Sequence, residues 1–365
     1  MLKRINQVEP NITSVDINKI NEYLDSGGWI TEHNVTRNLE DRISSLLNRK
    51  YAVAVPNGTI AIYLSLLSAG IEKGSRVAVP NITMIATINA VLWAGATPVL
   101  IDVDETLSMS LESLKEIDNL NALIFVPLNG RSGQGIEIDQ YCDENKILMI
   151  EDSAHALGSN YENISCGSIG KLSILSFTPH KIITMGQGGM VLLDDDEIYE
   201  NLIDLKTFNR EKDKSDWHKG FGLNFKITDL QASLGLSQFD RLNEFINIKK
   251  TNQRCYENNL KNLKNFKTIS FQDYETPWFH DLICSSEKIK NDLSDYLASN
   301  NIETRNSYPA LSFQSYLNDI EKSKVEYSEK ISNNVLWLPS STNLEQQDID
   351  FICELIQKFD NEVAV

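Results

Sequence analysis

Between residues 51 and 193, short apolar runs alternate with stretches of helical periodicity, and this alternation limits the possible folds more than any other feature. The runs have the length of strands and occur at 76–79, 98–102, 122–127 and 148–152. Strands that alternate with helices form parallel sheets covered by helices on both faces. We therefore expect a doubly wound α/β domain.

The length of the chain predicts a second, smaller domain. At 365 residues the chain is longer than a single hydrophobic core usually supports. An amphipathic pattern at 228–247 indicates the long helix that leads into the second part. Strand-like runs and a closing helix follow, at 271–284, 303–312 and 346–359. We place the large domain, with an N-terminal helix at 11–26, over residues 1–240 and the small domain over 241–365.

Charge and composition argue against several kinds of partner. The net charge of −17 and the sequence pI near 4.8 disfavour nucleic acids and anionic membranes. No apolar stretch reaches the roughly 18 residues of a membrane helix, and the first residues lack the apolar core of a signal peptide, so we expect a cytoplasmic location. The five cysteines show no paired short spacing, which indicates neither a metal site nor a disulfide framework.

A lysine in a sharp connection gives the strongest chemical signal. Lys181 lies between the apolar run 172–177 and the glycine-rich segment 186–189, shortly after Pro179. Burial in a cleft would lower the pKa of its amine and make it a nucleophile toward carbonyl groups, as Schiff-base formation requires. From this segment alone, a solvated lysine in a strand connection is the alternative.

An acidic residue follows another apolar run. Residues 147–150 are apolar, and Glu151 and Asp152 come directly after them. Asp152 would therefore lie at the carboxyl end of a parallel strand, where open α/β sheets bind ligands. A pyridoxal phosphate (PLP) site needs both a Schiff-base lysine and an acid at the pyridinium nitrogen. A structural ion pair is the alternative for Asp152.

A possible anion site precedes an apolar helical pattern at 60–69. Asn57-Gly58-Thr59 connects this pattern to a strand that ends near Val55. Free backbone amides at a helix start, together with the Thr59 hydroxyl, can hold a phosphate. Alternatively, the segment only shapes a turn and Thr59 caps the helix.

These segments, with three others, resemble the DegT/DnrJ/EryC1/StrS sugar aminotransferases in their order along the chain. The matching segments are Gly58-Thr59, 80–87, Glu151-Asp152, Ser176-Phe177, Lys181 with 186–189, and 222–232. The resemblance extends from about Trp29 through the C-terminal segment. It implies the fold-type I architecture of PLP-dependent transferases, with a mostly parallel mixed sheet in the large domain and a smaller α+β C-terminal domain.

The resemblance also implies roles for individual residues. Lys181 would form the Schiff base with PLP, and Asp152 would keep the pyridine nitrogen of PLP protonated. His155 would lie beside the cofactor ring and its 3-hydroxyl. The phosphate would be held by Gly58, Thr59 and Ser176 of one subunit and by Asn224 of the partner subunit. A complete site would then require a homodimer.

Some positions depart from the family pattern. Met84 stands where the family usually stacks an aromatic residue on the PLP ring, and a thioether lacks that stacking geometry, so we expect weaker cofactor binding. Lys226 and Gln187 replace a common arginine and a common glutamate without touching the central chemistry. His180 is adjacent to Lys181, but counting back from Gly186 gives the lysine the Schiff-base position.

The acceptor is less well defined by the sequence. Residues 127–133 replace the His-Leu-Tyr-Gly segment of many nucleotide-sugar enzymes. They resemble the branch that includes aminotransferases acting on free keto sugar acids and on other small carbonyl compounds. Arg131 could pair with a carboxylate or phosphate, or be an exposed turn residue. The aromatic cluster at 278–281 is interpreted as domain packing. The candidate substrate-binding residues are Trp29, Asn129, Arg131, Arg305 and Tyr308.

The expected activity is a ping-pong transfer of an amino group, from glutamate, to a keto or aldehydo sugar in surface polysaccharide or amino-sugar biosynthesis. A small phosphorylated ketone such as dihydroxyacetone phosphate is the alternative acceptor. A PLP-dependent sugar 3-dehydratase would carry a histidine in place of Lys181. A non-catalytic regulator on the same fold is disfavoured by the presence of Lys181 and Asp152.

Overall fold

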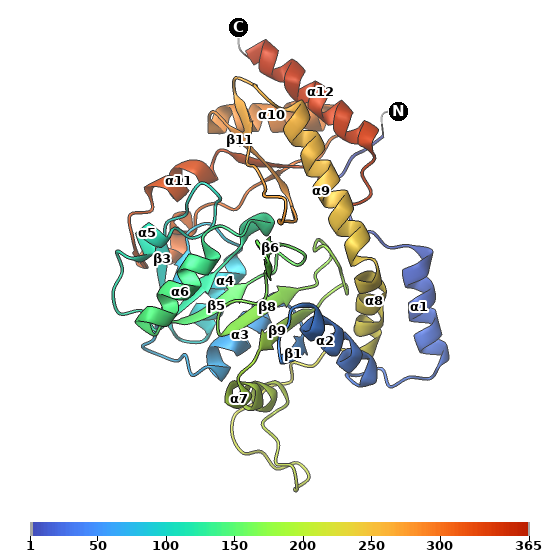
Figure 1. Cartoon of the computed structure of the whole chain (residues 1–365), viewed down its shortest axis with the longest axis vertical. Coiled ribbons are helices and arrows are strands. Elements are labelled where there is room, and N and C mark those ends of the chain that lie inside the picture. The colour runs from blue at the N-terminus through green and yellow to red at the C-terminus, as the bar shows by residue number, and fades with distance from the viewer. Residues whose placement is uncertain (1–2, 364–365) are drawn as a thin grey trace.

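The computed structural model describes residues 3–363 and has a central sheet between two layers of helices (Figure 1). The sheet has eight strands in the order β1-β9-β8-β5-β4-β2-β3-β13. Strand β9 is antiparallel to both β1 and β8, and the remaining pairs are parallel. The bounds are β1 Tyr51–Val55, β2 Arg76–Pro80, β3 Thr97–Ile101, β4 Ala122–Phe125, β5 Leu148–Asp152, β8 Leu172–Ser176, β9 Gly189–Leu193 and β13 Glu321–Lys322.

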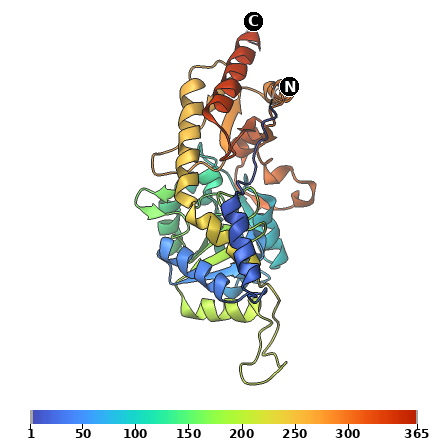
Figure 2. The same cartoon turned by 90° about the vertical axis from the view of Figure 1, so that its right-hand side faces the viewer.

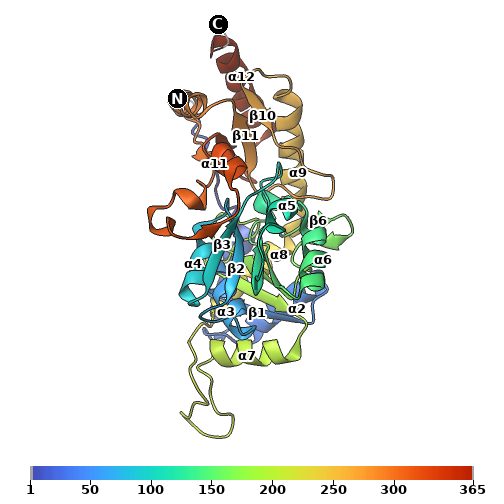
Figure 3. The same cartoon turned by 90° about the vertical axis from the view of Figure 1, so that its left-hand side faces the viewer.

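Both faces of this sheet are covered, which explains why its strands are continuous apolar runs. Side chains alternate between the two faces of a strand. In β2, Val77 and Val79 pack into the core beneath α3 and α4, whereas Ala78 packs into the core that includes Ile138 and Cys142 of α6. Figure 3 shows α3 and α4 on one side of the strands and α6 on the other. The expected doubly wound α/β architecture is confirmed.

The helices and short elements connect the strands in the order that the periodicity predicts. The α-helices are α1 Ser14–Asp25, α2 Asn34–Leu46, α3 Gly58–Ser68, α4 Ile85–Trp93, α5 Leu111–Leu114, α6 Gly135–Asn145, α7 Asp196–Lys206, α8 Asp229–Asp240, α9 Leu242–Asn259, α10 Glu287–Ser299, α11 Glu326–Ser332 and α12 Gln346–Val363. The 3-10 turns are η1 Leu128–Gly130, η2 Leu311–Phe313 and η3 Ser315–Leu317, and a two-stranded hairpin pairs β6 Asn160–Tyr161 with β7 Ile164–Ser165. Within residues 3–363, no helix is long and apolar enough to cross a membrane.

A second, antiparallel sheet lies toward the C-terminus. Its order is β10-β11-β14-β12, with bounds β10 Phe266–Thr268, β11 His280–Cys284, β12 Arg305–Asn306 and β14 Val335–Leu338. The core on this sheet draws its apolar side chains from α9, α10 and α12 as well. Figure 1 shows α9 rising from the large sheet toward this smaller one.

The predicted helix at 228–247 is instead two helices, α8 and α9. Arg241 separates them, because its backbone (φ −101°, ψ 3°) leaves the helical region. The domain boundary predicted at residue 240 falls at this break. Two segments cross it, since Ile5 pairs with Ile302 and β13 joins the large sheet beside β3. The division into 1–240 and 241–365 therefore stays a prediction.

Two strand-like runs were interpreted too broadly. Of residues 271–284 only β11 is a strand, and of 303–312 only β12 is. Prolines are one physical reason, because Pro277 and Pro309 have no N–H to donate to a neighbouring strand. Glu275 contributes as well, since its side chain accepts the N–H of Gln272 and closes a turn.

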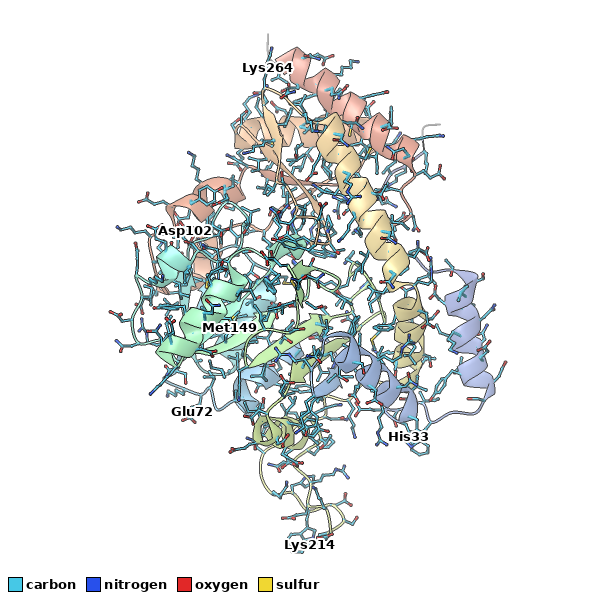
Figure 4. All side chains as sticks on the ribbon, viewed as in Figure 1. His33, Glu72, Asp102, Met149, Lys214 and Lys264 are labelled. Atoms are coloured by element: carbon cyan, nitrogen blue, oxygen red, sulfur yellow. The ribbon has the colours of Figure 1, made fainter. Side chains whose placement is uncertain are left out.

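A long loop, residues 207–228, projects from the body of the molecule between α7 and α8 (Figure 2). Lys214 marks its far end in Figure 4. Trp217 and Phe221 in this loop are 63% and 69% exposed. Such exposed aromatic side chains are typical of surfaces that bind another protein.

Candidate active site

The candidate site is a cavity of about 490 Å³ at the carboxyl ends of the strands of the large sheet. Strands β1, β2, β4, β5 and β8 run in the same direction, so the residues that follow them meet at one edge. The volume is in the range of small-molecule sites. The lining residues are Asn57, Gly58, Thr59, Ile62, Thr83, Met84, Ala86, Val126, Asp152, Ala154, His155, Ser176, Thr178, His180, Lys181, Gln187, Trp278, Arg305 and Tyr308.

Lys181 is held in a tight turn after β8. Its backbone N–H donates to the carbonyl of Thr178 at 3.0 Å. Burial lowers the pKa of the Lys181 amine to about 7, with Asp152 opposing this shift and Arg305 adding to it. A large share of the amine is therefore neutral near pH 7, which is the form that attacks a carbonyl carbon.

Asp152 ends β5 and faces the same cavity. Its carboxylate accepts the hydroxyl of Thr87 at 3.0 Å and the backbone N–H of Ala154 at 3.3 Å. Burial raises the pKa of the Asp152 carboxyl, while the Thr87 hydrogen bond and Lys181 act in the opposite direction. A buried carboxyl of this kind suits a hydrogen bond to a protonated ring nitrogen.

His155 is buried within the cavity wall. Burial lowers the pKa of its imidazole well below the ordinary value, and the positive charges of Lys181 and Arg305 act in the same direction. Its Nδ1 atom has no hydrogen-bond partner in the described protein. A buried, unpartnered nitrogen is costly unless a ligand atom satisfies it.

The start of α3 provides an anion cradle. The Asn57 side chain accepts the N–H of Ile60 and so caps the helix, and the alternative in which Thr59 is the cap is wrong. The Thr59 hydroxyl lines the cavity instead. A Cβ atom on Gly58 would lie 3.1 Å from the Ser176 Cβ, so glycine lets the helix start approach Ser176 closely. The free backbone amides at the start of α3, together with the hydroxyls of Thr59 and Ser176, can bind a phosphate.

The residues present fit PLP, because the cavity combines four features that this cofactor needs. These are a buried amine of lowered pKa, a buried carboxyl, an unpartnered imidazole nitrogen and an anion cradle. They come from elements that are distant in sequence and that the sheet brings together. The arrangement can bind a phosphorylated aldehyde and position an amine beside it.

Four of the five candidate substrate-binding residues form two pairs. Arg305 and Tyr308 line the cavity. Asn129 and Arg131 are fully buried elsewhere, where both side chains donate to Asp281, at 2.9 and 2.6 Å. Arg131 is thus neither an exposed turn residue nor part of the cavity, because Asp281 takes up its charge.

The two remaining candidates lie on the surface. Trp29 is 69% exposed and lies outside the cavity of its own chain. Asn224 is also exposed, on the long loop, where its backbone pairs with that of Thr207. Its assignment to the phosphate of the partner subunit stays a prediction.

Among the residues of the site that sequence reasoning missed, Thr87 and Trp278 have specific contacts. Thr87, the hydroxyl donor to Asp152, lies within the matching segment 80–87 but carries no signal of its own. Trp278 was interpreted as domain packing, which is incomplete. It is buried in the core, and it also lines the cavity, with the Lys181 Nζ 4.0 Å from the centre of its ring.

Comparisons with known proteins show the family of the chain. The family model of the DegT/DnrJ/EryC1/StrS aminotransferase family matches residues 10–357. The chain is 31% identical to the GDP-perosamine synthase of Escherichia coli O157:H7 over 300 residues, which cover 81% of this chain and 82% of that protein. It is 32% identical to the putative pyridoxal phosphate-dependent aminotransferase EpsN of Bacillus subtilis over 273 residues, or 72% and 70% of the two chains.

The fold is also that of solved sugar aminotransferases. The putative sugar aminotransferase Spr1654 from Streptococcus pneumoniae, in its PMP form, has a TM-score of 0.93 at 24% identity, with 99% of each chain covered. Helicobacter pylori PseC, an aminotransferase involved in the biosynthesis of pseudoaminic acid, has a TM-score of 0.92 at 22% identity, covering 99% of this chain and all of PseC. The chain belongs to the DegT/DnrJ/EryC1/StrS aminotransferase family and is a PLP-dependent aminotransferase.

Proposed function

We propose that this aminotransferase moves an amino group from glutamate to a keto or aldehydo sugar, for a surface polysaccharide or an amino sugar. The proposal depends mainly on one observation, the pair of buried Lys181 and Asp152 in a single cavity. The relatives support a sugar acceptor, since one of them is a GDP-perosamine synthase. We place the reaction in the cytoplasm, which cell fractionation tests.

Each group in the cavity would have a defined task. Bound PLP supplies an electron sink for the charge left on the donor carbon when its proton leaves. Gly58, Thr59 and Ser176 would bind the cofactor phosphate. Asp152 would keep the ring nitrogen protonated, and Thr87 would hold the Asp152 carboxylate in place.

The Lys181 amine would move the proton. Because its pKa is about 7, Nζ can accept a proton from the α-carbon of the donor and return it without a large energetic penalty in either direction. His155 stays neutral because it is buried, so it adds no positive charge that would lower the basicity of Lys181 further. Its Nδ1 would gain a partner on the cofactor.

Arg305 is the group best placed to bind an anionic substrate. It lines the cavity, and within residues 3–363 its guanidinium forms no ion pair. Its guanidinium lies 5.3 Å from the ring of Trp337, which orients it. A carboxylate or phosphate would be recognised through the planar fork of the guanidinium. With a net charge of −17, attraction of an anion must come from such local groups.

Turnover with glutamate tests the acceptor class. We would compare a nucleotide-linked keto sugar, a free keto sugar acid and dihydroxyacetone phosphate, with Lys181→Ala as the inactive control. We expect amination of a sugar. If only the phosphorylated small ketone were aminated, the sugar assignment would fail while the aminotransferase reaction stood.

We also propose a homodimer with shared sites. Exposed aromatic residues support it: Trp217 and Phe221 on the long loop, and Trp93 on α4, which is 53% exposed. A mixture of Lys181→Ala and Asn224→Ala chains provides the test. Each mixed dimer would hold one site with both native residues, so about a quarter of the native activity should return. No recovery after subunit exchange would show that Asn224 is not shared between subunits.

A further inference from the structure

Trp278 is unusual in being both fully packed and part of the cavity wall. It comes two residues before β11 of the smaller sheet, yet its side chain packs in the core of the large sheet and lines the cavity there. Its side chain is only 4% exposed. The Lys181 Nζ lies 4.0 Å from the centre of its ring, within the range of a cation–π contact.

The backbone of Trp278 is fixed at both ends. Its N–H donates to the carbonyl of Asn129 at 2.9 Å. Its carbonyl accepts the Lys249 Nζ and the Ser340 hydroxyl, each at 2.8 Å. Lys249 is buried on α9, and burial lowers the pKa of its amine to about 7. Three separate segments therefore determine where this tryptophan stands.

The indole N–H of Trp278 reaches the turn that carries Lys181. It donates to the carbonyl of His180 at 2.7 Å, across 98 residues of sequence. The same ring lies 3.8 Å from the ring of His155, centre to centre. One side chain thus contacts the lysine, the residue before it and the histidine of the cofactor wall.

Met84 does not provide an equivalent contact. Its side chain is 43% exposed, and its sulfur accepts the N–H of Ala86 at 3.1 Å at the start of α4. An exposed thioether that caps a helix cannot give the cavity a rigid aromatic surface. Trp278 supplies a rigid aromatic surface of this cavity, together with Tyr308.

We propose that Trp278 is a positioning residue for Lys181: its N–H fixes the turn at His180, and its ring holds the amine in the cavity. This inference rests on the proposed function, because the position of the amine matters only if Lys181 reacts. A residue that served packing alone would need neither the hydrogen bond to His180 nor the contact with Nζ.

Two substitutions separate the two contacts. Trp278→Phe keeps an aromatic ring but removes the N–H, and Trp278→Leu removes both. Trp337→Phe is the matched control, because it also removes a buried indole N–H, one that donates to Asp281 at 2.8 Å and not to the turn, while it keeps an aromatic ring beside Arg305. Thermal unfolding of the apo proteins shows how much each variant loses in general stability.

Two quantities are measured on each protein: the dissociation constant of PLP, and the pH dependence of Lys181 acetylation in the apo protein. Trp278→Phe should raise the dissociation constant about two- to tenfold, the cost of one hydrogen bond, with the Lys181 pKa unchanged. Trp278→Leu should in addition lower that pKa by about half a unit, because the ring face stabilises the ammonium. Trp337→Phe should change neither.

Native values in both Trp278 variants, or equal changes in Trp337→Phe, would overturn the proposal. If Trp278→Leu does not fold, the comparison of the PLP dissociation constants of Trp278→Phe and Trp337→Phe is sufficient to test the proposal. A failure of the proposed function would look different: the native protein would still bind PLP at Lys181 and the Trp278 variants would still weaken that binding, but glutamate would not aminate a keto or aldehydo sugar.

Discussion

Replacing Arg131 by methionine is expected to destabilise the protein and to leave substrate affinity unchanged. The Arg131 Nη2 donates to the Asp281 carboxylate at 2.6 Å, and the two side chains are 1% and 0% exposed. Removing the arginine leaves a buried carboxylate that still accepts hydrogen bonds from Asn129 and Trp337. We expect a loss of about 3 kcal/mol, the lower end for breaking a buried ion pair.

Methionine isolates the electrostatic effect. It has a similar length to arginine and can keep the contact with the Phe271 ring, over which the Arg131 guanidinium lies at 4.1 Å. Asp281→Asn should destabilise the protein as well, because it leaves the buried positive charge of Arg131 without a negative partner. The double variant should lose less than the sum, since no buried charge remains unpaired.

The assay combines urea unfolding of the apo proteins with the KM for glutamate and for the acceptor. The structure predicts lower unfolding midpoints with native KM values. A native midpoint together with a KM raised at least tenfold for an anionic substrate would refute this reasoning and restore Arg131 as a substrate ligand.

Three further predictions follow from individual contacts. Thr87→Val removes the hydroxyl that Asp152 accepts, so the Asp152 pKa should rise further and kcat should fall about tenfold, with Thr87→Ser as the rescuing control. The rate at which Lys181 of the apo protein reacts with PLP should rise with pH through about 7 and then level off, because the neutral amine replaces the ammonium over that range. A rate that kept rising to pH 10 would contradict the lowered pKa of Lys181. Burial alone would raise the pKa of the Asp229 carboxyl, but hydrogen bonds from Thr36 and from backbone amides at the start of α2 outweigh burial and hold this pKa below its ordinary value. Asp229→Ala loses these hydrogen bonds, so it should lower the free energy of unfolding by about 2 kcal/mol at pH 7, as thermal unfolding would show. The native protein should lose this contribution only as the pH falls below the ordinary carboxyl range, and the difference between the two proteins should shrink there.

The sequence predicted those parts of the site that depend on strand ends. Asp152 and Ser176 each end a buried parallel strand, so their approach to one another follows from the sheet itself. Lys181 enters the same cavity because its turn follows directly after β8. For these residues, local patterns and the family resemblance point to the same arrangement.

Contacts between distant segments were beyond the reach of one sequence. Arg131 and Asp281 are 150 residues apart, and nothing near either residue shows that they pair. Trp278 belongs to an aromatic run that reads as core, and only the folded chain shows that it reaches Lys181. The break at Arg241 was hidden because the apolar pattern continues through it.

The most direct test of the account is the absorbance spectrum of the purified protein with PLP, recorded before and after glutamate is added. The native protein should show the visible band of PLP linked to a lysine, and glutamate should convert it to the near-ultraviolet band of the aminated cofactor. Lys181→Ala should lack the protein-linked band. A native protein without this band, or a Lys181→Ala protein that retains it, would contradict the assignment of Lys181.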